Sequence, residues 1–211
     1  MKCYAELKDD KFTFYVEDVP KEYEDVVIAA YMKKVEDRFI KEYEMSEYIE
    51  PNLLKANFSR LTERMITQRG ENWDKALVFW IDTAKKHGIE WYLRGSATDA
   101  IRGAKLTPHD LDIVVHTRDF FKIKDYVIEP FIDNHGTWVV RYFGRLCLEG
   151  VMVDVDADEK ENAENYSLQY EVVQWKGYTI LMEPFENRYK TEMLRGRTDR
   201  IEKLNELKGL I

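Results

Sequence analysis

The stretch that most constrains the fold is residues 91–116, WYLRGSATDAIRGAKLTPHDLDIVVH. It opens inside a short apolar run, residues 89–93, which is typical of one buried strand. Gly95 and Ser96 then predict a tight turn, because glycine adopts backbone angles that other residues resist. A short helical segment follows, and Gly103 ends it. The pattern therefore predicts a strand, a turn and a short helix in immediate succession.

Two carboxylates begin the next predicted strand, residues 110–115. Because side chains alternate along a strand, Asp110 and Asp112 share one face and lie about 7 Å apart along it. Like charges this close raise each other's pKa, and a bound divalent cation removes the conflict. Carboxylate oxygens are ligands that suit Mg²⁺. The pair is therefore a candidate magnesium site.

The Gly95–Ser96 turn predicts the other half of a nucleotide site. Free backbone N–H groups and the helix dipole at the start of a helix both favour an anion such as a phosphate. Arg94 and Arg102 flank the short helix, and a guanidinium group can bind phosphate oxygens bidentately. These four residues are therefore candidates for binding the phosphates of a nucleotide.

In this order, Gly95-Ser96, a short helix and Asp110-Leu111-Asp112 resemble the signature of the DNA polymerase β-like nucleotidyltransferase superfamily. The form is closest to its small single-chain members, such as the lincosamide and aminoglycoside nucleotidyltransferases and the abortive-infection toxin-type enzymes. The resemblance covers about residues 75–205. It implies an α/β (α+β) fold in which a mixed β-sheet carries the carboxylates on one face and helices on the other.

The resemblance also implies a reaction. An acceptor hydroxyl attacks the α-phosphorus of a nucleoside triphosphate (NTP), and pyrophosphate leaves, with Mg²⁺ as the cofactor. Gly95 and Ser96 would hold the β- and γ-phosphates. Lys190, in the last predicted helix, matches the lysine that meets the triphosphate in the resembled family. The partners expected are thus an NTP and a hydroxyl acceptor that the sequence does not identify.

A third carboxylate is expected on a strand beside the first pair, where it completes the metal site and helps to activate the acceptor. Residues 151–156 alternate strictly, so that Asp154 and Asp156 both fit this position. Asp154 is favoured because it lies deeper in the apolar run, whereas Asp156 borders an acidic segment that predicts an exposed loop, residues 158–165.

The remaining elements follow from hydrophobic spacing and turn residues. In the first third of the chain, residues 3–16 predict a hairpin, and residues 21–48 and 53–65 predict helices. Further along we expect helices over 72–86, 118–127 and 184–207, strands over 137–143, 145–149 and 151–156, and a hairpin over 170–182. We therefore divide the chain into an N-terminal hairpin and mostly helical extension, residues 1–70, and a nucleotidyltransferase-like domain, residues 71–211.

Composition limits the partners and the compartment. The net charge of −8 gives no sequence-wide support for nucleic-acid binding, although a local basic patch would still allow it. No apolar run approaches a membrane span, and the N-terminus lacks an apolar signal region, so we expect no membrane partner. Cys3 and Cys147 have no metal-like spacing and predict free thiols in a reducing cytoplasm.

Other nucleotide signatures are missing, since the sequence has neither a GxxxxGK[ST] loop nor a GxGxxG motif after a strand. A small-molecule acceptor is the favoured interpretation. Two alternatives stay open: a toxin-type nucleotidyltransferase that acts on RNA or protein, and a non-catalytic nucleotide-binding regulatory protein that keeps the fold.

Overall fold

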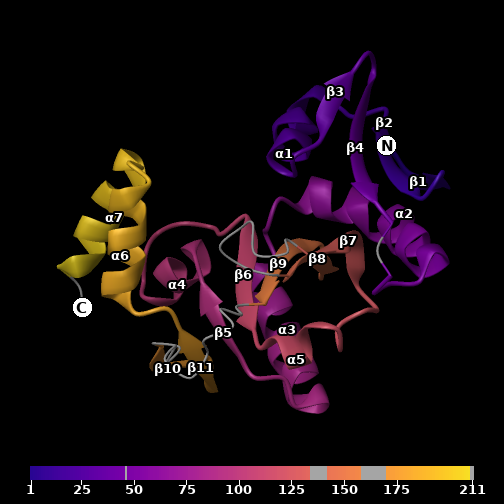
Figure 1. Ribbon diagram of the computed structural model, residues 1–211. Coiled ribbons are helices and arrows are strands. Elements are labelled where there is room, and N and C mark those ends of the chain that lie inside the picture. The colour runs from indigo at the N-terminus through magenta and orange to yellow at the C-terminus, as the bar shows by residue number, and fades with distance from the viewer. Residues whose placement is uncertain (46, 134–141, 158–169, 210–211) are drawn as a thin grey trace.

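The computed structural model describes residues 1–45, 47–133, 142–157 and 170–209, and Figure 1 shows how they are arranged. Within these ranges the strands form two sheets. A four-stranded sheet near the N-terminus has the order β1-β2-β4-β3, and a seven-stranded sheet has the order β10-β11-β5-β6-β9-β8-β7. The candidate site residues lie on or beside the larger sheet.

The N-terminal sheet is antiparallel throughout. Its strands are β1 (Lys2–Lys8), β2 (Lys11–Glu17), β3 (Lys33–Val35) and β4 (Arg38–Glu44). The hairpin predicted for residues 3–16 is confirmed by β1 and β2. The short helices η1 (Lys21–Tyr23) and α1 (Glu24–Ala29) join β2 to β3.

The prediction of one helix over residues 21–48 is wrong. The chain turns with positive φ at Tyr31 (62°) and Glu36 (57°), which a continuous helix does not allow. β4 then pairs with the free edge of β2, so that Phe39 lies opposite Val16 and both are buried. Of the apolar residues at helical spacing, Val27 is buried in α1 and Phe39 in β4, whereas Tyr31 and Val35 are exposed. Tertiary structure therefore overrides the local pattern.

The long helix α2 (Pro51–Gln68) joins the two sheets, because it packs against both β1 and β7. It begins where the Glu50 side chain accepts a hydrogen bond of 2.8 Å from the Leu53 N–H, with Pro51 in the first turn. This confirms the helix predicted over residues 53–65. The hydrophobic core continues from the N-terminal sheet through α2 into the larger sheet, and the domain boundary at residue 70 stays a prediction.

The larger sheet is mixed, as predicted. β6 and β9 run parallel, whereas β5 is antiparallel to β6 and β8 is antiparallel to β9. Its strands are β5 (Trp91–Arg94), β6 (Asp110–Val115), β7 (Val127–Asp133), β8 (Tyr142–Leu148), β9 (Val151–Ala157), β10 (Glu171–Trp175) and β11 (Tyr178–Met182). These bounds confirm the strand predicted over 151–156 and the hairpin predicted over 170–182.

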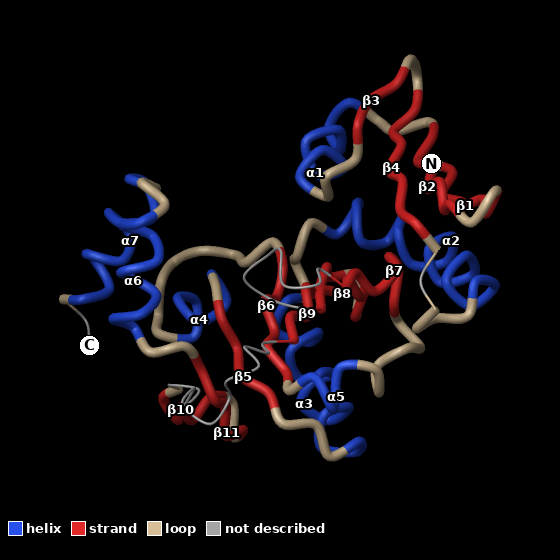
Figure 2. The backbone as a smooth tube through the Cα atoms, in the orientation of Figure 1, coloured by secondary structure: helices blue, strands red, loops and turns tan. Residues whose placement is uncertain are grey.

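The helices that follow residue 70 cover the sheet and its ends, as the tube in Figure 2 shows. They are α3 (Trp73–His87), α4 (Ser96–Ile101), α5 (Thr117–Phe120), α6 (Phe185–Leu194) and α7 (Thr198–Lys208). α3 confirms the helix predicted over 72–86, and it ends at Gly88 with a left-handed φ of 60°. Leu111, Ile113 and Val153 fill the apolar side of the sheet and are almost fully buried.

Two further element predictions need correction. The helix expected over 118–127 stops at Phe120, because Val127 and the residues after it pair with β8. The helix expected over 184–207 is two helices, α6 and α7, separated at Gly196, where φ is 64°. The expected strand over 137–143 falls largely outside the described residues, and so does the expected loop over 158–165.

Two sequence-level expectations concern the environment of the chain. None of the described helices is both long and apolar enough to cross a membrane. Cys3 and Cys147 are free thiols, as predicted, and Cys147 is buried in β8.

Candidate active site

Charged residues form a row across five adjacent strands of the larger sheet. Arg94 in β5 lies opposite Asp112 in β6, and Asp112 lies opposite Asp154 in β9. Asp154 lies opposite Arg145 in β8, and Arg145 lies opposite Glu129 in β7. Paired residues of neighbouring strands share a face of the sheet. This row, from Arg94 to Glu129, therefore lies on the side opposite the apolar residues and is called the charged row below.

Asp110 stands beside the charged row, two residues before Asp112 on the same strand. Burial, and then the charges of Asp112 and Asp154, raise the pKa of Asp110 to about 7. Burial, and then Asp154, also raise the pKa of Asp112. The folded chain thus holds two carboxyl groups whose negative charges are incompletely compensated, as the sequence led us to expect.

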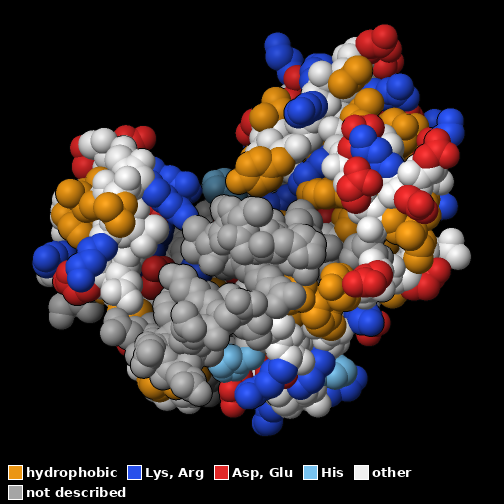
Figure 3. Space-filling model, viewed as in Figure 1, with side chains coloured by type: hydrophobic (Ala, Val, Ile, Leu, Met, Phe, Trp, Pro, Cys, Tyr) orange, Lys and Arg blue, Asp and Glu red, His pale blue; other side chains and the backbone are white. Residues whose placement is uncertain are grey.

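Four arginines partly offset this repulsion. Arg94, Arg188 and Arg200 lower the pKa of Asp112, and Arg145 and Arg200 lower that of Asp110, although burial and the neighbouring carboxylates outweigh them. Arg200 comes from α7, far along the chain from β6. Figure 3 shows that Lys and Arg side chains gather on the side of α6 and α7 that faces the central sheet.

The carboxylates fit Mg²⁺ as a pair completed by a substrate. In the described residues no group of three His, Cys, Asp or Glu side chains is arranged to hold a metal by itself. Mg²⁺ is, however, commonly bound by one or two carboxylates together with substrate phosphates and water. Burial and the neighbouring carboxylates both raise the pKa values of Asp110 and Asp112, and a bound cation would favour their charged forms.

Only glycine fits at position 95. It precedes the first residue of α4 with a φ of 72°, and a Cβ atom added there would lie 1.8 Å from Asp112 Oδ2. The Gly95 backbone also hydrogen-bonds to the Glu183 carboxylate. The turn that the sequence assigned to phosphate binding therefore lies directly against the carboxylate assigned to the metal, and Ser96 follows as the first residue of α4.

Asp154 is held by Arg145, a residue that the sequence analysis missed. The Arg145 Nε donates to Asp154 Oδ1 at 2.7 Å, and Nη2 donates to Oδ2 at 2.9 Å, which makes a bidentate pair. Arg145 is fully buried. Asp156 lies on the same strand face, and its Oδ2 is 4.0 Å from an Arg94 nitrogen. Asp154 is thus the one of the two that is paired with Asp112 across the strands.

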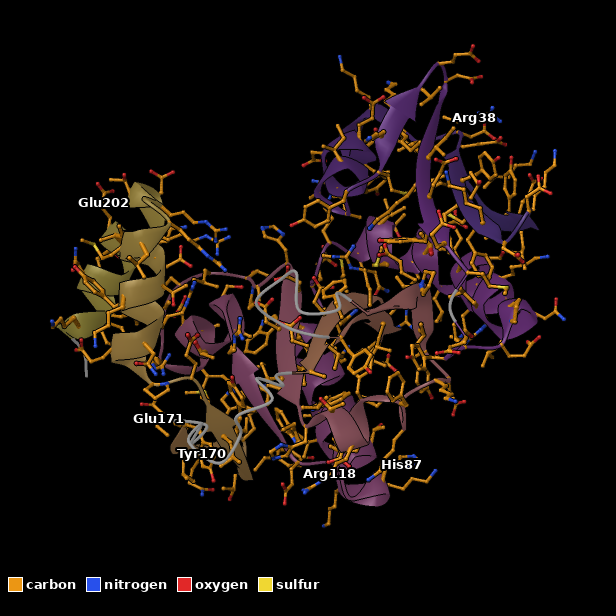
Figure 4. The ribbon with its side chains drawn as sticks, viewed as in Figure 1. Arg38, His87, Arg118, Tyr170, Glu171 and Glu202 are labelled. Atoms are coloured by element: carbon orange, nitrogen blue, oxygen red, sulfur yellow. The ribbon has the colours of Figure 1, made fainter. Side chains whose placement is uncertain are left out.

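Arg102 ties neighbouring elements together. Its Nε and Nη2 donate to Glu171 Oε1 at 3.1 and 2.6 Å, and Nη2 also donates to the Glu183 carbonyl oxygen. Figure 4 labels Glu171 where β10 begins, at the edge of the larger sheet. In this arrangement Arg102 anchors the end of α4 to β10, whereas Arg94 stands within the charged row.

Lys190 is exposed on α6. Lys190 is two residues from both Arg188 and Glu192, which corresponds to a rotation of about 200° around the helix axis. It therefore lies on the side of α6 opposite to those two residues. Arg188 and Glu192 are buried, and they contact each other. Arg188 donates to Asp99 Oδ2 of α4 at 3.2 and 3.1 Å, which fixes α6 against α4.

Arg188 and Arg145 escaped the sequence analysis for different reasons. Arg145 is a lone charge in an apolar strand, YFGRLCL, and that was a usable signal for a buried ion pair. Arg188 and Glu192 are spaced four apart on a helix, a common pattern on solvated helix faces. The position of Arg200 depends on the break at Gly196, which separates α7 from α6.

Among proteins of known structure, the chain resembles nucleotidyltransferases. A Thermotoga maritima protein described as a candidate nucleotidyltransferase is 18% identical, with a TM-score of 0.49; the match covers 67% of this chain and 95% of that one. The lincosamide antibiotic adenylyltransferase LnuA, bound to lincomycin, is 14% identical, with a TM-score of 0.45; the match covers 63% of this chain and 96% of LnuA. No family model and no curated protein sequence matches this chain.

Proposed function

We propose that the chain is a Mg²⁺-dependent nucleotidyltransferase that transfers a nucleoside monophosphate from an NTP to an acceptor hydroxyl. The observation that carries this proposal is the placement of Asp154 directly opposite Asp112, beside Asp110. Three carboxylates on adjacent parallel strands, with arginines around them, suit the binding of a metal–triphosphate complex.

The proposed roles follow from position. Asp110 and Asp112 hold Mg²⁺, which when bound supplies positive charge to the phosphate oxygens. Asp154 orients the acceptor hydroxyl and receives its proton. The hydroxyl oxygen forms a bond to the α-phosphorus while the bond from that phosphorus to the pyrophosphate oxygen breaks. Pyrophosphate leaves with the electron pair of the broken bond.

The phosphate end is proposed from the same geometry. Gly95 and Ser96 contact the phosphates from the turn before α4, and Arg94 and Arg200 offset their negative charge. Both arginines already act on the electrostatics of Asp112. Lys190 was assigned to the triphosphate from the family resemblance, and that assignment stays a prediction.

A small-molecule acceptor is the proposed class, and the site is proposed to work in the cytoplasm. The net charge of −8 supports a small molecule over a nucleic acid, because a chain of net negative charge repels phosphate chains at long range.

The test is a transfer screen. The purified chain is incubated with Mg²⁺, each of four NTPs and separate pools of hydroxyl-bearing antibiotics, tRNA and protein, and pyrophosphate release is measured. We expect release that depends on Mg²⁺ and on a small-molecule pool. Release with tRNA or protein alone would support the toxin-type alternative. NTP binding without release in any pool would support the non-catalytic alternative.

A further inference from the structure

The charged row continues beyond the larger sheet into the N-terminal sheet. Glu129 is the last residue of the row, and its Oε1 accepts from Arg145 Nη1 at 3.2 Å. Its other oxygen, Oε2, accepts from Lys41 Nζ at 2.8 Å and from the Tyr43 hydroxyl at 2.6 Å. Lys41 and Tyr43 both belong to β4. Glu129 thus connects Arg145, through Oε1, to the N-terminal sheet, through Oε2.

A backbone carbonyl makes a second link between the same two sheets. The Ala30 oxygen, just after α1, accepts from Lys41 Nζ at 3.1 Å and from Arg145 Nη1 at 3.3 Å. The neighbouring Tyr31 ring lies over both cations, with its centroid 5.5 Å from Lys41 Nζ and 5.6 Å from the Arg145 guanidinium carbon. The N-terminal unit therefore contacts Arg145 directly as well as through Glu129.

The charges of this network balance. Arg145 and Lys41 are the cations, and Glu129 and Asp154 are the anions. Arg145 and Glu129 are almost fully buried. Burial raises the pKa of Glu129, but the charges of Arg145 and Lys41 outweigh that effect and hold it below its usual value. The charge of the buried Glu129 carboxylate is compensated by all of its hydrogen-bond donors together. If one donor is removed, the ion pair with Arg145 must compensate more of that charge.

We propose that the N-terminal sheet is a positioning element of the active site: Lys41 and Tyr43 hold Glu129, Glu129 holds Arg145, and Arg145 fixes the carboxylate of Asp154. This inference rests on the proposed function, and it gives a role to the N-terminal sheet, residues 2–44, which lies outside the region covered by the resemblance. Lys41 and Tyr43 act through other residues and touch no reacting atom.

Tyr43→Phe is the sharpest variant, because it removes one hydroxyl and keeps the ring that packs edge-on against Phe14. Glu129 then loses one hydrogen-bond donor. We expect Arg145 to shift toward Glu129, which weakens its hydrogen bonds to Asp154. We expect kcat for transfer to fall about tenfold, because catalysis is sensitive to small displacements of an orienting group. The KM for NTP should stay unchanged, because Asp110 and Asp112 are untouched.

A matched control lies in the same sheet. The Tyr4 hydroxyl donates to Glu17 Oε1 at 2.7 Å, so that Tyr4→Phe removes the same kind of bond at a distance from the charged row. Lys41→Met and Lys41→Arg form a second pair, in which Met should lower kcat and Arg should restore part of it. If Lys41→Met does not fold, Tyr43→Phe still carries the test.

The decisive experiment measures Tyr43→Phe and Tyr4→Phe in the wild-type and Asp154→Asn backgrounds, by single-turnover pyrophosphate release with the NTP and acceptor from the transfer screen. The Nε–H resonance of Arg145 is followed by ¹⁵N NMR in the same proteins. We expect Tyr43→Phe alone to lower turnover in the wild-type background, to shift the Arg145 resonance, and to have no further effect on turnover when Asp154 is already Asn.

Equal effects of Tyr43→Phe and Tyr4→Phe on turnover, or an unshifted Arg145 resonance in Tyr43→Phe, would overturn the inference and leave the proposed function standing. An equal fold-loss in both backgrounds would do the same, since Tyr43 would then act independently of Asp154. If Asp154→Asn has no measurable turnover, the inference is judged by the Arg145 resonance and by the comparison of Tyr43→Phe with Tyr4→Phe in the wild-type background. A wild-type chain that transfers nothing in the screen overturns the proposed function first, and this inference with it.

Discussion

Gly95 and Asp112 approach so closely that no side chain fits between them. A Cβ atom at Gly95 would lie 1.8 Å from Asp112 Oδ2 and 2.9 Å from its Cγ. The two residues come from the two halves of the motif that first drew attention in the sequence, the turn and the carboxylate strand. Their contact means that the proposed phosphate and metal sites are one site.

Gly95→Ala should therefore abolish Mg²⁺-dependent nucleotide binding, because Asp112 must move to make room for the added methyl group. Gly103→Ala is the control: Gly103 also has a positive φ, 104°, but a Cβ there meets nothing within 4 Å. Both variants share a backbone strain of about 1–3 kcal/mol. Calorimetric titration with Mg²⁺ and a non-hydrolysable NTP separates them, and equal affinities would show that the close contact is unimportant for binding.

Asp110→Asn should stabilise the metal-free chain at alkaline pH. The pKa of Asp110 is raised to about 7, so the folded state binds a proton that the unfolded state has released. The resulting stability is present below about pH 4 and is lost as pH rises through about 7. At about pH 8 the Asn variant should unfold with a free energy on the order of 4 kcal/mol higher than wild type.

Thermal unfolding without Mg²⁺, followed from about pH 4 to about pH 9, measures this difference. Addition of Mg²⁺ should stabilise wild type at the upper end of that range and affect Asp110→Asn much less. Stability curves for the two proteins that run parallel over the whole range would contradict the burial and charge repulsion inferred for Asp110.

Asp154→Asn should remove most of the turnover and leave nucleotide binding largely intact, since the Asp110–Asp112 pair remains. Asp156→Asn should cost little, because Asp156 lies beyond the row that Asp154 shares with Asp112. Steady-state kinetics and nucleotide titrations on both variants decide the matter. If Asp156→Asn is the inactive enzyme, the third carboxylate has been assigned to the wrong residue of β9.

Arg200→Ala should weaken NTP affinity about tenfold, because Arg200 acts on both Asp110 and Asp112 from α7. Lys190→Ala and Ser96→Ala test the assignment made from the family resemblance, in which Lys190 matters more than Ser96. The placement of Lys190 on the outer side of α6 leads us to expect a smaller loss than for Arg200→Ala. Titration of all three variants with one NTP ranks them, and an intact affinity in Arg200→Ala would remove α7 from the site.

Local patterns were sufficient for the strand, turn and strand around Gly95 and Asp112, because glycine, alternation and short apolar runs act within a few residues. The same alternation placed Asp154 on a strand face. Its position opposite Asp112 depends on parallel pairing between segments about forty residues apart, which no local pattern specifies. The role of Arg145 was equally hidden, since its partners Asp154 and Glu129 lie on the two neighbouring strands.

The N-terminal region shows how a local pattern can mislead. Val27, Tyr31, Val35 and Phe39 recur at helical spacing, yet Phe39 is buried by strand pairing with Val16. A single chain does not reveal which of two periodicities its tertiary contacts will favour. The contacts of Lys41 and Tyr43 with Glu129 depend on that outcome, and a continuous helix would not have suggested them.

The most direct test of the central claim follows the phosphorus atoms of the NTP. The wild-type chain is incubated with Mg²⁺, an acceptor from the screen and NTP labelled in separate reactions at the α- or the γ-phosphate. Attack at the α-phosphorus predicts that the α-label appears in the acceptor, that the γ-label appears in pyrophosphate, and that Asp112→Asn loses both. A γ-label released as orthophosphate or found in the acceptor, or product formation unchanged in Asp112→Asn, would contradict the account.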